Sequence, residues 1–166
     1  MLRFLVLGFV LVTGSFGTAG LAMEGLKPPA ILTVSGALPA RMNTNLLRFD
    51  REMLASRGWH EFQTITSLDT KERRLSGVTL GAFLSSLGID GGTLRAVSAQ
   101  DDVLEIAFSD ALQQSALLAL DLNGRPLGVQ EMGPIWLVFP VTKEEAAERN
   151  FVNQTVVQLV RIEIAR

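Results

Sequence analysis

The sequence predicts an α+β fold: a single domain with a mixed or mostly antiparallel sheet and a few short helices. Many short apolar runs are separated by turns rich in Gly, Pro and Asn, which is typical of strands. The clearest helical pattern, between Thr79 and Gly88, places four apolar residues on one face: Leu80, Phe83, Leu84 and Leu87. The 166 residues, 48% of them apolar, are enough for one domain with a sizeable core.

The first 22 residues have the pattern of a secretory signal peptide. Arg3 precedes an apolar run, and small residues lead to Ala22, where we expect cleavage. We therefore expect a periplasmic or otherwise secreted protein. An uncleaved membrane anchor is the alternative, because residues 4–22 carry no charge and nearly reach the length of a span. Residues 23–29 then form an exposed leader, and residues 30–166 form the folded domain.

The composition excludes several functional classes. The chain has 15 Lys and Arg against 17 Asp and Glu, so it lacks the excess of basic residues that nucleic-acid binding requires. It has no Cys, which excludes thiolate metal sites, redox pairs and a cysteine nucleophile. It also has no Tyr and only one His, so few side chains are available for acid–base catalysis.

The first part of the domain reads as short elements joined by loops. Asp50 suits the N-cap of a short helix, and Gly58 suits its left-handed end. Phe62, Thr64 and Thr66 share one face of an alternating strand. In chain order we expect a strand at 31–35, a loop at 37–45, a helix at 51–56, a strand at 60–66 and a polar loop at 67–74.

After the clearest helix, strands predominate. Asn123 and Gly124 can both adopt positive φ, which a type I′ turn requires. Thr142 and Glu145 have the spacing of a helix capping box. We expect strands at 94–99, 103–108, 116–122, 135–139 and 154–164, a helical turn at 109–115 that Ser109 caps, and a helix at 143–149. In the last strand the expected core positions are Val156, Val160, Ile162 and Ile164.

The order of these motifs resembles a known family. The pieces are Leu-Ser-Gly-Val-Thr-Leu at 75–80, Leu-Arg-Ala-Val-Ser-Ala at 94–99 before an acidic turn, and Leu-Asp-Leu-Asn-Gly-Arg-Pro-Leu at 120–127. Gly-Pro-Ile-Trp-Leu-Val-Phe-Pro at 133–140 and Val-Arg-Ile-Glu-Ile at 160–164 complete the series. Over residues 30–165 this resembles the oxidoreductase molybdopterin-binding domain, the fold of sulfite oxidase, and in particular its small exported bacterial version.

The resemblance implies a fold more firmly than a reaction. The family holds molybdenum through a cysteine thiolate in a loop that corresponds to residues 67–71, and it has an active-site tyrosine. This chain has neither residue type. We therefore expect no cofactor and no metal ligand. In the alternative, the chain is a molybdopterin-dependent oxidoreductase that keeps its cofactor without cysteine, with Ser67, Asp69 or Thr70 as an oxygen ligand.

Seven residues are candidates for lining a ligand pocket, and none is assigned a catalytic role. Each also has an ordinary structural interpretation. A histidine can pack at a strand edge, carboxylates are common in turns, threonines favour strands and a tryptophan favours a core. By the resemblance, the acidic turn and the Gly-Pro-Ile-Trp element lie beside the cofactor pocket. The candidates are His60, Thr66, Ser67, Asp69, Gln100, Asp101 and Trp136.

These observations favour an exported, non-catalytic binding or accessory module. It would bind a small molecule or a periplasmic or membrane partner protein. A purely structural interaction module is the third hypothesis. A cavity lined by Trp136, Gln100 and Thr66 would distinguish the binding module from the structural one.

Overall fold

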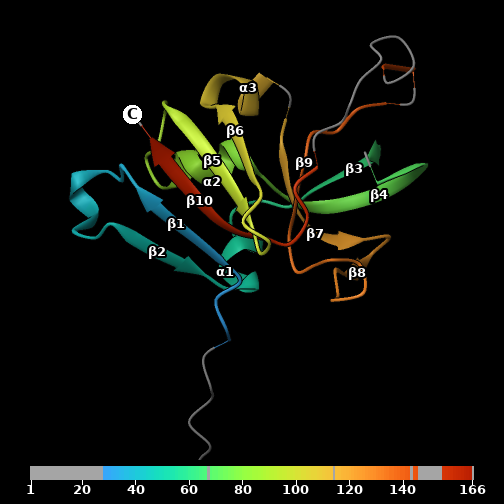
Figure 1. The fold of residues 1–166 in the computed structure, drawn as a ribbon, viewed down its shortest axis with the longest axis horizontal. Coiled ribbons are helices and arrows are strands. Elements are labelled where there is room, and N and C mark those ends of the chain that lie inside the picture. The colour runs from blue at the N-terminus through green and yellow to red at the C-terminus, as the bar shows by residue number, and fades with distance from the viewer. Residues whose placement is uncertain (1–27, 67, 114, 143, 146–154, 166) are drawn as a thin grey trace, which may run out of the picture.

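Two five-stranded sheets form the body of the molecule in the computed structural model, which describes residues 28–66, 68–113, 115–142, 144–145 and 155–165 (Figure 1). In this part of the chain, sheet A has the strand order β2 (Leu46–Phe49), β1 (Leu32–Gly36), β10 (Leu159–Ala165), β5 (Thr93–Ser98) and β6 (Val103–Ala107). Sheet B has the order β3 (His60–Thr66), β4 (Asp69–Thr79), β7 (Leu117–Leu122) and β8 (Arg125–Pro126), while β9 (Trp136–Val138) also pairs with β7.

The expected α+β class with mixed and antiparallel pairing is confirmed. In sheet A, β1 and β10 run parallel, and the other neighbours run antiparallel. All pairings in sheet B are antiparallel. The sequence predicted most of the strands but did not show that they divide into two sheets.

Strand β7 is paired along both of its edges. One edge pairs with β4 from Leu117 to Leu122. The other edge pairs with β9 at its beginning and with β8 at its end. Because both edges are hydrogen-bonded, β7 is an interior strand of sheet B, as its continuous apolar sequence predicts.

Three α-helices and one 3-10 turn connect the strands in the described residues: α1 (Arg51–Ala55), α2 (Leu80–Ser86), α3 (Phe108–Gln113) and η1 (Ala40–Met42). The Asp50 carboxylate accepts a hydrogen bond of 2.8 Å from the Met53 N–H, which confirms the predicted cap of α1. Thr79 occupies the N-cap position of α2, but its side chain makes no capping bond. The four residues of the predicted apolar stripe of α2 are all buried.

The buried side chains form two clusters. The larger one contains residues of sheet A and α2 together with Leu118 and Leu120 of β7. The smaller one lies on the other face of β7 and includes Leu117, Ala119 and Trp136. Strand β7 therefore contributes to both clusters by the ordinary alternation of side chains along a strand.

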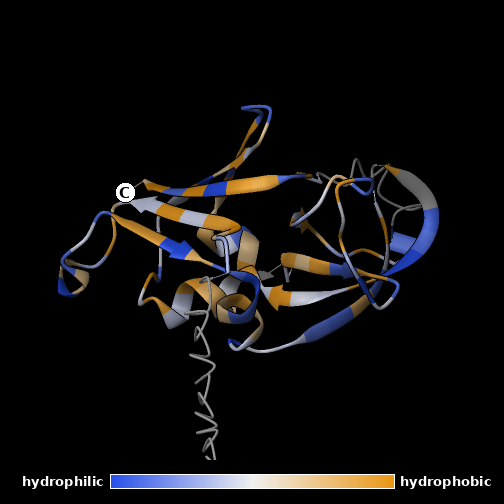
Figure 2. Cartoon of the chain, turned by 90° about the horizontal axis from the view of Figure 1, so that it is seen from below, coloured by the Kyte–Doolittle hydropathy of each residue, from blue (hydrophilic) through white to orange (hydrophobic). Residues whose placement is uncertain are grey.

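The predicted loop at 67–74 is wrong, because β4 already begins at Asp69 and pairs with β3. The outer part of this hairpin extends from the body of the molecule, and hydrophilic residues lie along it (Figures 1 and 2). Lys71, Glu72 and Arg74 are exposed. A strand exposed on both faces has no apolar alternation, so the sequence pattern could not reveal it.

Smaller differences have local causes. Strand β2 was missed within the short unassigned segment before α1. Helix α3 begins at Phe108, so Ser109 lies inside its first turn and does not cap it. Strand β10 begins only at Leu159, and its pairing with β5 shifts register between Leu159 and Arg161. As a result Leu159 is fully buried, whereas Val156 and Val160 are only half-buried.

Three expectations, the helix at 143–149, the signal segment and the leader, concern residues that are mostly outside the described part. The Thr142 and Glu145 backbone N–H groups each bond the other's side chain, at 2.9 and 3.2 Å, as a capping box requires. Most of the helix expected at 143–149 lies outside the described residues, as do the signal segment and positions 23–27 of the leader. No helix in the described part is long and apolar enough to cross a membrane.

Replacing Gly77 tests how closely β4 approaches β7. A β-carbon at this position would lie 2.0 Å from the Leu118 carbonyl oxygen, beside a register shift between the two strands. We expect Gly77→Ala to lower the free energy of unfolding by about 1–3 kcal/mol, because one strand must move. Gly91→Ala is the control, since a β-carbon there meets nothing within 4 Å. Equal urea midpoints for the two variants would contradict this packing.

Candidate functional site

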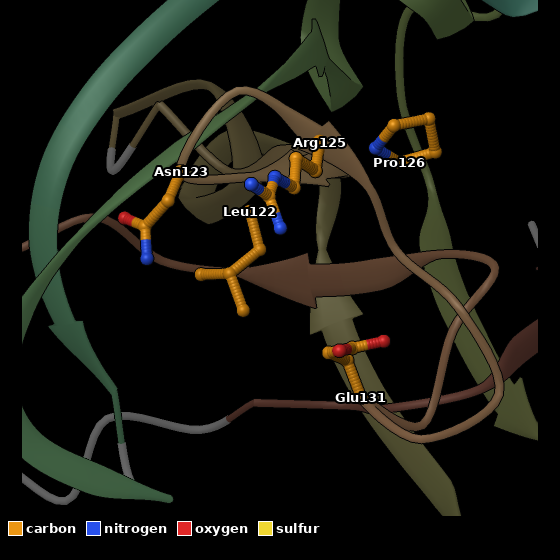
Figure 3. Close-up of a pocket in the computed structure, with 5 residues that line it drawn as sticks. All are labelled: Leu122, Asn123, Arg125, Pro126 and Glu131. Carbon is orange, nitrogen blue, oxygen red and sulfur yellow. The ribbon is translucent and has the colours of Figure 1, made fainter.

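A pocket of about 350 Å³ opens beside the turn between β7 and β8 (Figure 3). Its lining combines one cation, one carboxylate and one amide with two apolar side chains. The residues are Leu122, Asn123, Arg125, Pro126 and Glu131. The volume is at the lower end of the range for small-molecule sites, which is about 300–1,000 Å³.

The β7–β8 turn positions one side of the pocket. Asn123 and Gly124 have φ values of 52° and 78°, as the sequence predicts for a type I′ turn. The Asn123 N–H donates to the Arg74 carbonyl at 2.7 Å, and the Asn123 side-chain oxygen accepts from the Arg74 N–H at 3.2 Å. These two bonds fix Asn123 against β4 and leave its side-chain NH₂ group as a donor.

The loop at residues 127–134 supplies Glu131 from the opposite side. It begins with a bond from the Leu127 N–H to the Leu120 carbonyl at 2.9 Å, and it closes with a bond from the Gly133 N–H to the Gly128 carbonyl at 2.8 Å. The Glu131 carboxylate accepts from the Gly128 N–H at 3.1 Å. The loop therefore orients this carboxylate by its own backbone bonds.

Trp136 holds the same loop in place. Its indole N–H lies 2.9 Å from the Glu131 carbonyl oxygen and 3.0 Å from that of Met132, and bonds both. The side chain is 6% exposed and belongs to the smaller apolar cluster. A buried indole with its N–H satisfied is the usual state of a core tryptophan, and here it also positions the loop that carries Glu131.

A junction of three segments lies next to this loop. The Gln158 N–H donates to the Met132 carbonyl at 2.9 Å, and the Ala99 N–H donates to the Gln158 carbonyl at 2.9 Å. The Gln100 side-chain amide also bonds that of Gln158. Met132 and Gln158 have φ values of 54° and 47°, in a region that non-glycine residues seldom adopt. The surrounding hydrogen bonds maintain these conformations.

Of the seven candidates, the structure brings Gln100 and Trp136 together at this junction. Gln100 bonds Gln158, and Trp136 and Gln158 both donate to the Met132 carbonyl. Asp101 is exposed in the adjacent turn, with a φ of 64°. Among the candidates that the structure describes, none lines the pocket in Figure 3. A ligand role for them remains a prediction.

Three of the remaining candidates, His60, Thr66 and Asp69, belong to the β3–β4 hairpin. His60 begins β3 and is exposed, whereas Thr66 ends it and is buried. His60 pairs with Gly77 and Thr66 pairs with Asp69, so the hairpin separates the two ends of β3 by the length of the strand. Ser67 lies outside the described residues. The structure therefore does not bring His60 close to Thr66.

The segment that the sequence resemblance matches to a metal-binding loop contains no thiolate. Strands β3 and β4 remain paired as far as Thr66 and Asp69. The residue types at 67–71 offer hydroxyl, carboxylate and amine groups but no sulfur. A molybdenum centre of the family's thiolate type cannot form from these groups.

The chain has a sulfite oxidase-like fold, as the sequence resemblance implied. Among solved structures it is similar to the sulfane dehydrogenase SoxCD from Paracoccus pantotrophus, with a TM-score of 0.63 and 20% sequence identity. The match covers 86% of this chain, and the chain spans 40% of that SoxCD chain. No family model and no curated protein matches the chain. At this identity, the likeness shows the fold.

The sequence pattern did not indicate Arg125 and Glu131, the charged residues of the pocket, as site residues. Asn123 was recognised, but only for its turn conformation. Arg125 and Glu131 have no distinctive spacing, and they line one pocket only because the 127–134 loop folds back beside the β7–β8 turn. The one available signal was the concentration of Gly, Pro and Asn between two apolar strands, which marks an irregular connection.

Replacing Trp136 tests its role in the loop. Trp136→Phe keeps an aromatic ring but removes the N–H that the two carbonyls share, so we expect a loss of about 1–3 kcal/mol in the free energy of unfolding. The Gly133 N–H should also exchange faster with solvent. Trp59→Phe is the matched control, because Trp59 is 44% exposed and contacts the Arg51 guanidinium through its ring, 5.9 Å from the centroid. Unchanged Gly133 exchange in Trp136→Phe would contradict this role.

Proposed function

We propose that this chain is an exported, non-catalytic binding module built on the sulfite oxidase-like fold. In this proposal it acts in the periplasm or outside the cell and binds a small molecule or a partner protein. The observation that carries the proposal is a sulfite oxidase-like fold formed by a chain without cysteine. The fold resembles that of molybdopterin-binding oxidoreductase domains. The sequence resemblance implies that the metal in these domains is held by a cysteine thiolate, which this chain lacks.

The arrangement of the remaining polar groups supports binding over catalysis. The single histidine, His60, is exposed at the far end of β3 from the segment where the family places its metal. General acid–base catalysis needs such a group within hydrogen-bond reach of a bound substrate. The pocket beside β8 has the features of a binding site: opposite charges, an amide and apolar walls around a small volume.

Export is supported by the N-terminal sequence pattern, in which one basic residue, an apolar run and small residues precede Ala22. Mass spectrometry of the chain recovered from the periplasm of an expressing bacterium measures this directly. We expect a mass that corresponds to a chain beginning at Met23. A chain that retains residues 1–22 in the membrane fraction would replace export with anchoring.

Molybdenum and pterin content tests the absence of the cofactor. The full-length chain is produced in a host that makes molybdenum cofactor, and metal is measured by mass spectrometry and pterin by fluorescence after denaturation. We expect background levels of both, because no thiolate is available to hold the metal. A molybdenum enzyme from the same host serves as the positive control. Near-stoichiometric molybdenum would overturn the proposal and favour an oxidoreductase that holds its cofactor through oxygen ligands or a partner.

A further inference from the structure

The pocket in Figure 3 contains two opposite charges that do not neutralise each other. In the described part of the chain, the Arg125 guanidinium and the Glu131 carboxylate form no ion pair with each other within 4.0 Å. Glu131 accepts a hydrogen bond from the Gly128 N–H, which is a neutral donor. Both charges therefore remain available to a ligand that enters between them.

The polar groups of the pocket are arranged by type. Figure 3 shows Arg125 and Asn123 together on one side and Glu131 across from them. The side-chain oxygen of Asn123 is already bonded to the Arg74 N–H, so its NH₂ group is the part left for a ligand. One end of the pocket thus offers donors and a positive charge, and the other end offers an acceptor and a negative charge.

We propose that this pocket binds a small zwitterion, a molecule with a carboxylate at one end and an ammonium group at the other. The proposal rests on the proposed function as a binding module and names its ligand class. The carboxylate contacts Arg125 and Asn123, since the guanidinium fork suits a planar carboxylate. The ammonium group contacts Glu131.

The charge pattern selects against simpler ions. An anion without a cationic group would bring a second negative charge toward Glu131, and a cation without a carboxylate would face Arg125. Both combinations are repulsive at short range. A molecule with both charges in the matching order satisfies both ends, so the pair of charges acts as a filter for zwitterions.

The size and walls of the pocket limit the zwitterion further. About 350 Å³ accommodates a molecule of a few heavy atoms between the charged ends. Leu122, which is half-buried, and Pro126 provide an apolar contact for a short aliphatic segment. Small amino acids meet these conditions. Because Arg125 and Glu131 are exposed to solvent, we expect weak binding, with dissociation constants of about 1 mM.

An NMR titration of the full-length chain tests the ligand class. The probes are glycine, β-alanine and γ-aminobutyrate, which differ in the separation of their charges, with propionate and propylamine as singly charged controls. We expect at least one zwitterion to shift the Gly128 backbone amide and the Asn123 side-chain NH₂ resonances in a saturable manner. Propionate and propylamine should bind at least about tenfold more weakly than that zwitterion.

Two charge-neutralising variants locate the site. Arg125→Gln and Glu131→Gln should each weaken binding of the best zwitterion at least about tenfold. Arg48→Gln is the matched control, because Arg48 is an exposed arginine on β2 in the other sheet. It should leave the titration unchanged. The proposal is overturned if no zwitterion binds, if propionate binds equally well, or if Arg48→Gln and Arg125→Gln behave alike.

The titration and the cofactor assay test different claims, so the result of one can contradict its claim while the other claim stands. The titration reports on the pocket beside β8, whereas the molybdenum and pterin assay reports on the cofactor. A cofactor-free chain that binds no zwitterion overturns only the ligand class. A chain that contains molybdenum overturns the non-catalytic assignment, whatever the titration shows.

Discussion

The structure depends on the burial of β7 on both faces. Leu118 and Leu120 enter the larger apolar cluster, while Leu117 and Ala119 enter the smaller one. The strand is also hydrogen-bonded along both edges, to β4 on one side and to β8 and β9 on the other. A shift of one residue in its register would exchange the side chains of the two clusters, so packing strongly specifies this register.

The same strand fixes the position of the pocket. The Leu120 carbonyl accepts bonds from the Arg51 side chain at 3.0 Å and from the Leu127 N–H at 2.9 Å. Arg51 also pairs with Asp121 at 2.5 Å, which links α1 to the end of β7. The pocket lies where β7 leaves the core. Its charges come from β8 and from the loop at 127–134, and both are hydrogen-bonded to the buried β7. Sites placed in this way keep their geometry better than sites on loops alone.

The sequence was informative wherever burial leaves a periodic trace. The apolar stripe of α2, the continuous apolar run of β7 and the Asn123-Gly124 turn were all predictable from local rules. The outer half of β4 was not, because Lys71, Glu72 and Arg74 are solvent-exposed and follow no apolar alternation. The pocket was not predictable either. Arg125 and Glu131 line it together through a loop held by the Trp136 indole, and such tertiary contacts have no local signature.

The central place of β10 in sheet A has a consequence for biosynthesis. The β1–β2 pair and the β5–β6 pair are each close in sequence, but only β10 joins them. Its neighbour β1 is distant along the chain: Thr33 bonds the Val160 carbonyl, 127 residues away. Sheet A therefore cannot close until β10 has been synthesised, and contacts of such long sequence separation form slowly. Until then the edges of β1 and β5 that later pair with β10 remain open, and the growing chain stays accessible to chaperones and to any machinery that threads unfolded polypeptide.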